Sequence, residues 1–201
     1  LTLAGGPRRG GDENLAIIEN GAVLVRDGRI VDVGESRSLI EKYPHEDMLD
    51  ASGRVVMPGL VDPHTHLVWA GDRAAEFEAR LQGKTYMEIM AAGGGINATV
   101  RATRQASPEE LYAQTRRRAE AMFRNGTTTA EAKTGYGLAF DAEIVQLEVL
   151  LRLDAEGPLE IAPTFMAAHA IPPEYTGRDE EYTRLVSADM LPRLKDWWTT
   201  R

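Results

Sequence analysis

Residues 58 to 165 alternate between short apolar runs and longer segments with helical spacing, and this alternation constrains the fold more than any other feature. The apolar runs are 60–68, 127–132 and 159–165, and the helical segments between them are 108–124 and 141–155. Ser107 before Pro108 is a helix start signal and Asn125-Gly126 is a stop signal, so the helix 108–124 is the most clearly defined element. Strands that alternate with helices favour a parallel sheet, so we predict an α/β fold.

The segment before this alternation is rich in hairpin signals. Asn20-Gly21 and Asp27-Gly28 separate short apolar runs, and both dipeptides are typical of tight turns between antiparallel strands. We therefore predict two domains: residues 1–56 as the N-terminal part of a small β-sandwich, and residues 57–201 as the first part of a (β/α)8 TIM-like barrel. Residues 1–14 have the composition of a loop.

The predicted barrel is partial. We count three strands, whereas a (β/α)8 barrel has eight and typically takes about 250 residues. The chain also begins at Leu1 and ends at Arg201 without a helix stop signal, so we expect a truncated chain.

The composition of the chain restricts the partners and metal ligands that it can have. The net charge is -8, with 31 acidic and 23 basic side chains, which argues against a nucleic-acid partner. The sequence contains no cysteine, so metal ligands must be histidine nitrogen or carboxylate oxygen. We find neither a signal peptide nor an apolar run of about 18 residues, and we expect a cytoplasmic protein without a membrane partner.

His64 and His66 stand two residues apart at the end of the first apolar run. Residues i and i+2 of a strand point to the same face, with the chain spanning roughly 6 to 7 Å between them, so both rings can meet one metal ion. The alternative is an ordinary pair of surface or core histidines bonded to their neighbours.

Other candidates follow the ends of the predicted strands, where αβ barrels carry their chemistry. Arg73 could bind a substrate carboxylate with its planar guanidinium, or form a surface ion pair with Asp72. Tyr86 and Tyr136 could reach into the site or pack on a helix and a glycine turn, and His169 could be functional or structural. Elsewhere, we interpret Glu131 and Lys133 as a salt-bridged pair, and residues 116–118, three consecutive arginines, as a solvated helix face.

Several ordered motifs resemble a known family. The run VVMPGLVDPHTH at 55–66 resembles the opening strand of the metal-dependent amidohydrolases. Within that superfamily the chain resembles the imidazolonepropionase family of histidine degradation, through DPHTHLVWAGDR at 62–73, RLQGKTY at 80–86, AGGGI at 92–96, KTGYGL at 133–138 and PTFMAAHA at 163–170.

This resemblance implies a reaction and roles for the candidates. The reaction would be hydrolysis of the cyclic amide of 4-imidazolone-5-propanoate to N-formimidoyl-L-glutamate. His64 and His66 would bind one divalent ion, Zn or Fe, per subunit of a homodimer. Arg73 would bind the propionate of the substrate with Tyr86 and Tyr136 beside it, and His169 would contact the ring as a hydrogen-bond donor or proton relay.

The resemblance also implies what is missing. The family uses a further histidine and an aspartate as metal ligands and an acidic general base, and no histidine follows His169 here. We expect these groups beyond residue 201 and expect the 201 residues alone to be inactive. Two alternatives stay open: another cyclic amidohydrolase or a deaminase of the superfamily, and a noncatalytic metal-binding half-barrel.

Overall fold

The computed structural model describes residue 2 and residues 15–201, so the predicted loop at 1–14 lies almost wholly outside the described residues. The chain divides into two compact units, residues 1–59 and residues 60–201. Each unit is described by itself. Within the described residues, no helix is both long and apolar enough to cross a membrane.

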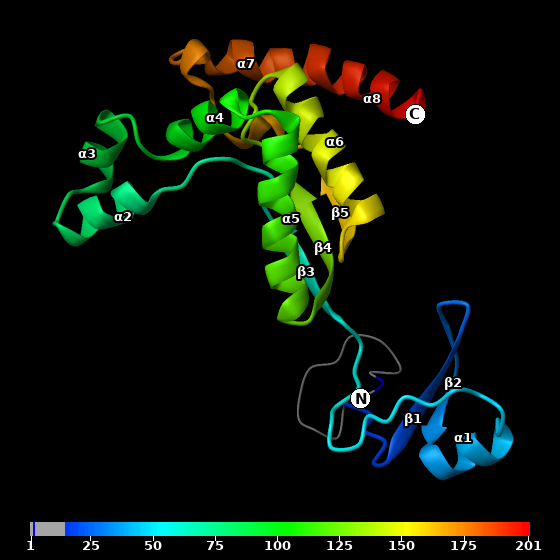
Figure 1. The fold of residues 1–201 in the computed structure, drawn as a ribbon. Helices are drawn as coiled ribbons and strands as arrows, with labels where there is room; N and C mark the ends of the chain where they lie inside the picture. The colour runs from blue at the N-terminus through cyan, green and yellow to red at the C-terminus, as the bar shows by residue number, and fades with distance from the viewer. Residues whose placement is uncertain (1, 3–14) are drawn as a thin grey trace. The chain divides into compact units, whose positions relative to one another are not determined.

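The first unit contains a β-hairpin and one short helix (Figure 1). Strands β1 (Gly21–Arg26) and β2 (Arg29–Glu35) pair antiparallel and are followed by α1 (Ser36–Lys42). The turn residues Asp27 and Gly28 have φ of 50° and 70°, as a type I′ turn requires. The described part of this unit has one two-stranded sheet. The β-sandwich therefore stays a prediction.

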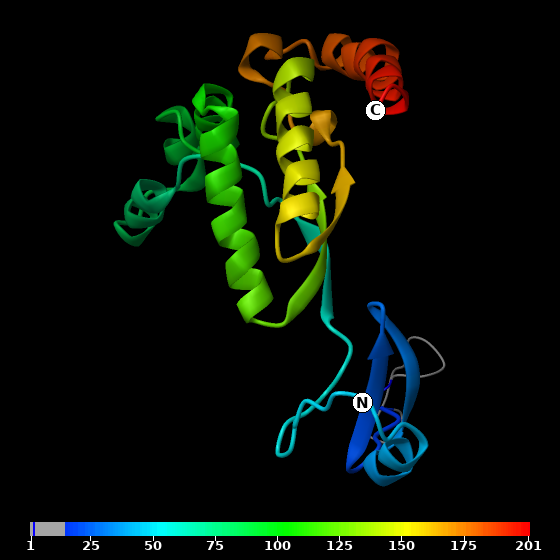
Figure 2. The same cartoon turned by 45° about the vertical axis from the view of Figure 1, so that its right-hand side comes forward.

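The second unit is built on a parallel sheet of three strands, β3 (Leu60–Thr65), β4 (Thr127–Lys133) and β5 (Glu160–Thr164), in the order β3-β4-β5. Helix α5 (Pro108–Arg124) connects β3 to β4, and α6 (Phe140–Glu156) connects β4 to β5. Both helices pack on the same face of the sheet (Figure 2). The predicted α/β alternation with a parallel sheet is confirmed.

The core of this unit lies between the sheet and the two helices. Ala130 and Ala132 of β4 are fully buried, which lets α5 and α6 approach the strand closely, and Leu150 and Leu153 of α6 fill the space above them. Because the small and buried side chains alternate with Thr129, Glu131 and Lys133, the opposite face of β4 is polar.

Helix α5 begins and ends where its sequence signals predict. The hydroxyl of Ser107 accepts a hydrogen bond from the amide of Glu110, and the Glu110 carboxylate accepts one from the amide of Ser107 in return, so the first turn has a complete capping box. Leu111, Thr115 and Ala119 form its buried face.

The two remaining connections follow the carboxyl ends of β3 and β5. Helices α2 (Ala74–Leu81), α3 (Tyr86–Ala91) and α4 (Ile96–Gln105) lie between β3 and α5. After β5 come the short helices η2 (Ala167–His169) and η3 (Pro173–Tyr175), and then α7 (Asp179–Leu185), η4 (Val186–Met190) and α8 (Leu191–Thr199).

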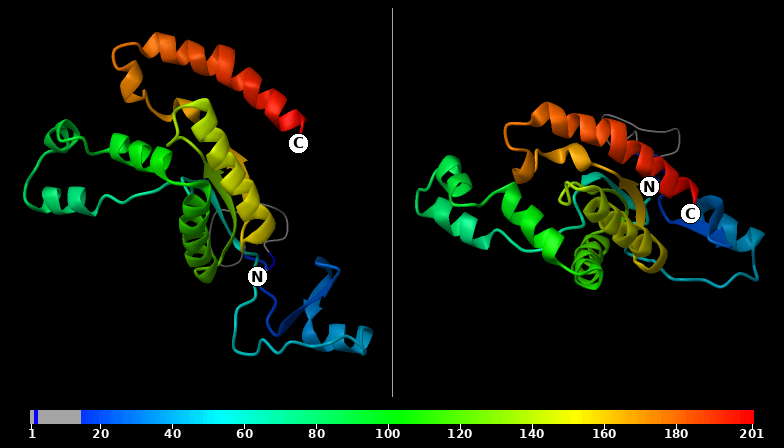
Figure 3. Two further views of the ribbon diagram at one scale, coloured as in Figure 1. Left: turned by 45° about the horizontal axis from the view of Figure 1, so that its top comes forward. Right: turned by 90° about the horizontal axis from the view of Figure 1, so that it is seen from above.

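The last three of these elements form one continuous rod (Figure 3). Segment η4 has π-helical hydrogen bonding directly before Pro192, which lies in the first turn of α8. A proline in a first turn needs no amide partner, and we attribute the continuity of the rod to this placement.

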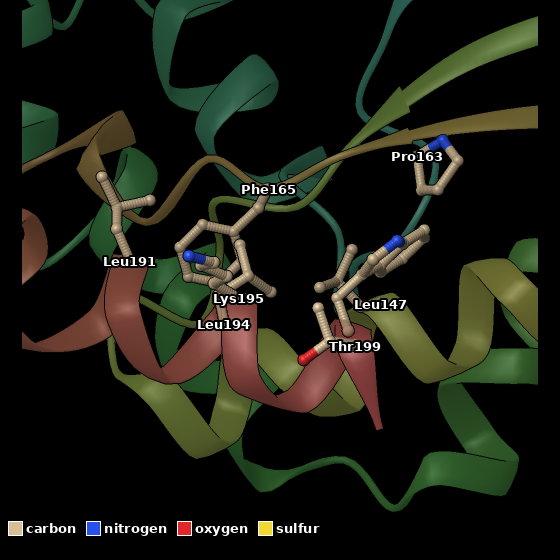
Figure 4. A pocket seen from close by; sticks show the side chains of 8 residues that line it. Leu147, Pro163, Phe165, Leu191, Leu194, Lys195 and Thr199 are labelled. Carbon is tan, nitrogen blue, oxygen red and sulfur yellow. The ribbon is translucent and has the colours of Figure 1, made fainter. Parts of the chain in front are cut away.

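Helix α8 leaves an open apolar pocket of about 340 Å³ beside α6 and β5 (Figure 4). It is lined by Leu147, Pro163, Phe165, Leu191, Leu194, Lys195, Trp198 and Thr199. None of these is a predicted site residue. The site candidates lie instead at the carboxyl ends of the parallel strands, which meet at one edge of the sheet.

Candidate metal and substrate site

His64 and His66 lie at the carboxyl end of β3. Their ring centroids are 6.0 Å apart, and the planes are inclined by 67°. Between them, the Thr65 hydroxyl donates a hydrogen bond to the carbonyl oxygen of Glu131 on β4, at 2.7 Å. Because alternate residues of a strand point to opposite faces, this bond directs Thr65 toward the neighbouring strand and leaves the two imidazoles on the other side.

Two further candidates join this pair from the ends of β4 and β5. The ring of His169 lies 4.4 Å from that of His66, and the ring of Tyr136 lies 5.2 Å from His66 and 5.6 Å from His169, measured between centroids. Together, His64, His66, Tyr136 and His169 form what we call the ring cluster. Residues more than 100 positions apart in the sequence thus meet at one edge of the sheet.

Two histidines of the ring cluster, His66 and His169, have pKa values that favour the neutral form. Burial lowers the pKa of His66 below its usual value of 6.5, and the nearby His169 lowers it further. Burial also lowers the pKa of His169, and His64 adds to this effect, whereas the Glu143 carboxylate opposes it. At neutral pH the rings of His66 and His169 therefore each carry a free lone pair, as a metal ligand requires.

The donor set fits part of a metal site. Nδ1 of His66 is buried and has no hydrogen-bond partner, which is unfavourable for a nitrogen that nothing coordinates. In the part of the chain that the structure describes, however, no three His, Cys, Asp or Glu side chains lie close enough together to hold a metal ion. Catalytic zinc sites usually have three protein ligands. His64 and His66 are therefore suited to be two ligands of an incomplete set.

Arg73 and Tyr86 are placed differently from the ring cluster. Nε of Arg73 donates a hydrogen bond to the Thr99 hydroxyl of α4 at 3.1 Å, rather than forming the ion pair with Asp72 considered above. Tyr86 begins α3 and is 64% exposed. Helices α2 and α3 project away from the sheet in Figures 1 and 3.

The loop after β3 is held by Arg118. Arg116 and Arg117 are exposed, as predicted for a solvated helix face, but for Arg118 this prediction is wrong. Nη1 of Arg118 donates to the carbonyl oxygens of Leu67 and Trp69 at 3.1 and 2.9 Å, and the guanidinium lies 3.5 Å from the centroid of the Trp69 ring. Burial lowers the pKa of Arg118 to about 10, so the side chain stays charged at neutral pH. Helical spacing alone could not reveal these distant carbonyl partners.

The loop after β4, residues 134–139, is held by Glu143, which sequence reasoning also missed. This fully buried carboxylate accepts hydrogen bonds from the amides of Gly135, Gly137 and Leu138. An acidic residue in the first turns of a helix is common, so nothing in the sequence distinguishes Glu143 from an ordinary one.

Glu131 and Lys133 form the predicted ion pair on the polar face of β4. Burial alone would raise the pKa of Glu131, but the hydrogen bonds from Lys133 and Thr164 and the charge of Lys133 together outweigh burial, so the pKa lies below its usual range. The pair therefore engages the Lys133 side chain in an ion pair within the same strand.

Comparison with known proteins shows which class of protein the chain resembles. A family model described as "Amidohydrolase family" matches residues 47–92, which include His64, His66 and Arg73, and one described as "Imidazolonepropionase-like composite domain, bacteria" matches residues 21–45. The chain is thus similar to amidohydrolases over residues 47–92, the segment that leads into the parallel α/β unit and carries the paired histidines.

Relatives named imidazolonepropionase identify the family within this class of protein. The chain is 51% identical to the protein of Chloroflexus aggregans over 98% of its own length and 47% of the relative. It is 49% identical to that of Geobacillus kaustophilus over 90% of the chain and 44% of the relative, and 51% identical to that of Symbiobacterium thermophilum over 96% and 47%. The chain therefore belongs to the imidazolonepropionase family. It spans about half the length of the curated relatives that it matches.

Proposed function

We propose that the chain is part of an imidazolonepropionase, which hydrolyses the cyclic amide of 4-imidazolone-5-propanoate to N-formimidoyl-L-glutamate. One observation carries the proposal: the ring cluster is assembled in a chain about half identical to proteins of that name. Residues 57–201 are then the first part of a (β/α)8 barrel, and residues 1–56 belong to a small β-sandwich.

His64 and His66 would hold one divalent ion, Zn or Fe, and the other ligands and the general base would come from outside residues 1–201. When bound, such an ion would polarise a carbonyl group and lower the pKa of a water molecule to about 7. The incomplete donor set among the described residues agrees with this division.

His169 would act as a hydrogen-bond donor to the oxygen on which negative charge develops. Because its pKa is lowered, its ring is neutral at neutral pH and has one N–H group to donate. Its position beside His66 supports a site near the scissile bond. The Tyr136 hydroxyl would assist from the adjacent edge of the ring cluster.

Arg73, with Tyr86, would bind the propionate of the substrate. The hydrogen bond from Nε to Thr99 uses one of the five N–H donors of the guanidinium and fixes its plane, so the remaining donors can bind a carboxylate. This role requires α3 to bring Tyr86 toward Arg73 in the bound state. We also propose a homodimer in the cytoplasm, without a membrane or nucleic-acid partner, in line with the acidic net charge.

The test is hydrolysis of freshly generated imidazolone propionate by the full-length gene product, followed by ultraviolet absorbance, with the metal content measured on the same sample. We expect turnover with about one metal ion per chain, and loss on the order of 10²-fold in kcat/KM for Arg73→Ala, since a lost charged contact leaves the carboxylate unpaired. Arg117→Ala, an exposed arginine of α5, is the control.

Three outcomes distinguish the alternatives. Turnover of a different cyclic amide or an amino-substituted ring, but not of imidazolone propionate, would replace the substrate and keep the class. A metal-loaded protein without any hydrolysis would indicate a noncatalytic metal-binding protein. Equal kcat/KM for Arg73→Ala and wild type would remove Arg73 from the propionate site.

A further inference from the structure

The loop between β4 and α6 has a backbone that few sequences can adopt. Gly135 has φ of +111° and Leu138 has φ of +51°, both in the left-handed region that L side chains rarely adopt. A loop of this shape turns successive amides to one side, and those amides need acceptors because the loop is largely buried.

One side chain supplies most of these acceptors. Oε2 of Glu143 accepts from the Gly135 amide at 2.9 Å, and Oε1 accepts from the amides of Gly137 and Leu138, both at 2.7 Å. The fourth amide of this run, that of Tyr136, donates to Oε1 of Gln146 at 3.4 Å. Both acceptor side chains are fully buried on α6. A buried carboxylate is unfavourable without such partners. Glu143 therefore needs the loop amides as donors, and the loop amides need Glu143 as their acceptor.

The same contacts fix two members of the ring cluster. Tyr136 lies between two amides that Glu143 holds, so its ring direction follows from the loop shape. Gly135 is in close contact with His169: a Cβ atom at position 135 would lie 2.8 Å from the Cβ of His169. The hydroxyl of Thr134 also accepts a hydrogen bond from the Met166 amide at 2.9 Å, which ties the loop to the segment that carries His169.

We propose that Glu143 is a positioning residue, which acts through the loop 134–139 to hold Tyr136 against His66 and His169 in the geometry needed for hydrolysis. This inference rests on the proposed function for its kinetic part. Both carboxylate oxygens of Glu143 are bound to backbone amides, so the residue acts through the loop and not on the substrate.

The first variant is Glu143→Gln, which keeps the size but replaces one acceptor oxygen by an NH₂ group. Whichever way the amide turns, a donor then faces at least one backbone N–H group, and the loop must change shape. We expect kcat/KM of the full-length protein to fall on the order of 10²-fold, as for a displacement of about 1 Å in a catalytic group. Glu148→Gln, the same change at an exposed position of α6, should leave kcat/KM unchanged.

A double-mutant cycle separates positioning from general destabilisation. If Glu143 acts through Tyr136, then Glu143→Gln combined with Tyr136→Ala should lose no more than about 3-fold beyond Tyr136→Ala alone, because coupled changes are not additive. Losses that multiply would overturn the proposal, as would wild-type kcat/KM in folded Glu143→Gln.

Hydrogen–deuterium exchange gives a measurement that does not depend on the substrate. The amides of 135–138 should exchange faster in Glu143→Gln than in wild type or Glu148→Gln, and unchanged exchange would overturn the proposal. If wild type does not hydrolyse imidazolone propionate, the proposed function fails, while faster exchange still supports the hold on the loop.

A milder variant keeps the proposal testable if Glu143→Gln does not fold. Gln146→Leu removes the acceptor for the Tyr136 amide and a donor to the Ala142 carbonyl within α6, and it leaves all three Glu143 contacts in place. We expect a kcat/KM loss that disappears in the Tyr136→Ala background, and a loss that persists in full there would again contradict positioning through this loop.

Discussion

The imidazole of His66 is the most constrained side chain of the ring cluster, because it is partly buried, neutral and in contact with two other rings. Replacing it with glutamine keeps a polar side chain but removes the nitrogen expected to bind the ion. We predict that His66→Gln lowers metal affinity by at least the roughly 10–100-fold typical for loss of a supporting partner. Metal content after dialysis measures this.

The matched control for this variant is His45→Gln. His45 is an exposed histidine of the first unit, so its replacement should leave metal content at the wild-type level. Equal metal content in His66→Gln and His45→Gln would remove His66 from the set of ligands.

Tyr182 gives a pH-dependent prediction. Its hydroxyl contacts the carbonyl oxygens of Ala167 and Leu138, at 2.6 and 3.1 Å, and burial raises its pKa above the usual 10.0. Above pH 10 the unfolded chain therefore loses a proton that the folded chain keeps, so the free energy of unfolding falls as pH rises. Tyr182→Phe should flatten this fall and, near neutral pH, cost about 1–3 kcal/mol for the unpaired carbonyls.

Denaturant unfolding of wild type and Tyr182→Phe between pH 8 and about 11 checks both parts. Tyr175→Phe, which changes a neighbouring tyrosine whose ring centroid lies 5.2 Å away, is the control for the loss of a tyrosine hydroxyl. Parallel pH profiles for wild type and Tyr182→Phe would contradict the prediction.

At the scale of elements, α5 both covers the sheet and holds the loop that follows His64 and His66. Arg118→Met keeps much of the length and apolar surface of the side chain but leaves the carbonyls of Leu67 and Trp69 without their donor. We predict a loss of about 1–3 kcal/mol in the free energy of unfolding, together with weaker metal retention. Chemical denaturation and metal analysis test the two effects.

Arg117→Met is the control for Arg118→Met, since Arg117 is the exposed neighbour on the same helix. If both variants lose the same stability, the carbonyl contacts of Arg118 contribute nothing measurable, and the effect belongs to helix charge alone.

Local sequence signals predicted the helices and strands well, but they did not predict the side-chain contacts that support the site. Helix α5 was predicted at its observed bounds because Ser107, Pro108 and Asn125 act within one turn of its ends. The first strand was predicted to run to residue 68 but ends at Thr65. Leu67 and Val68 are buried in the loop after the strand, and apolar character alone does not distinguish a buried loop residue from a strand residue. Arg118 and Glu143 could not be recognised, because their partners are backbone groups whose positions only the folded chain defines.

At the scale of the whole molecule, the chain spans about half the length of the curated relatives that it matches. Apolar side chains of the first unit are widely exposed, with Ile30 at 68% and Leu49 at 95%. Contiguous exposed apolar surface usually marks a place where other protein packs. We predict that the 201-residue chain alone turns over no imidazolone propionate and binds a hydrophobic dye more strongly than the full-length gene product.

Dye fluorescence and the hydrolysis assay on the two purified polypeptides test this prediction. Turnover by the 201-residue chain would contradict it and would mean that the ring cluster works without further ligands. Equal dye binding by both polypeptides would show that the exposed apolar side chains stay uncovered in the longer protein.

The order β3-β4-β5 also matters during synthesis. Within the described residues, β3 and β5 each have one side without a neighbouring strand, and such edges readily pair with other chains. A ribosome making a polypeptide as long as the relatives still has on the order of 200 residues to add when Arg201 emerges, which takes roughly 10–40 s at about 5–20 residues per second. For that time the nascent sheet is open on both sides, and we expect it to be a preferred client of ribosome-associated chaperones.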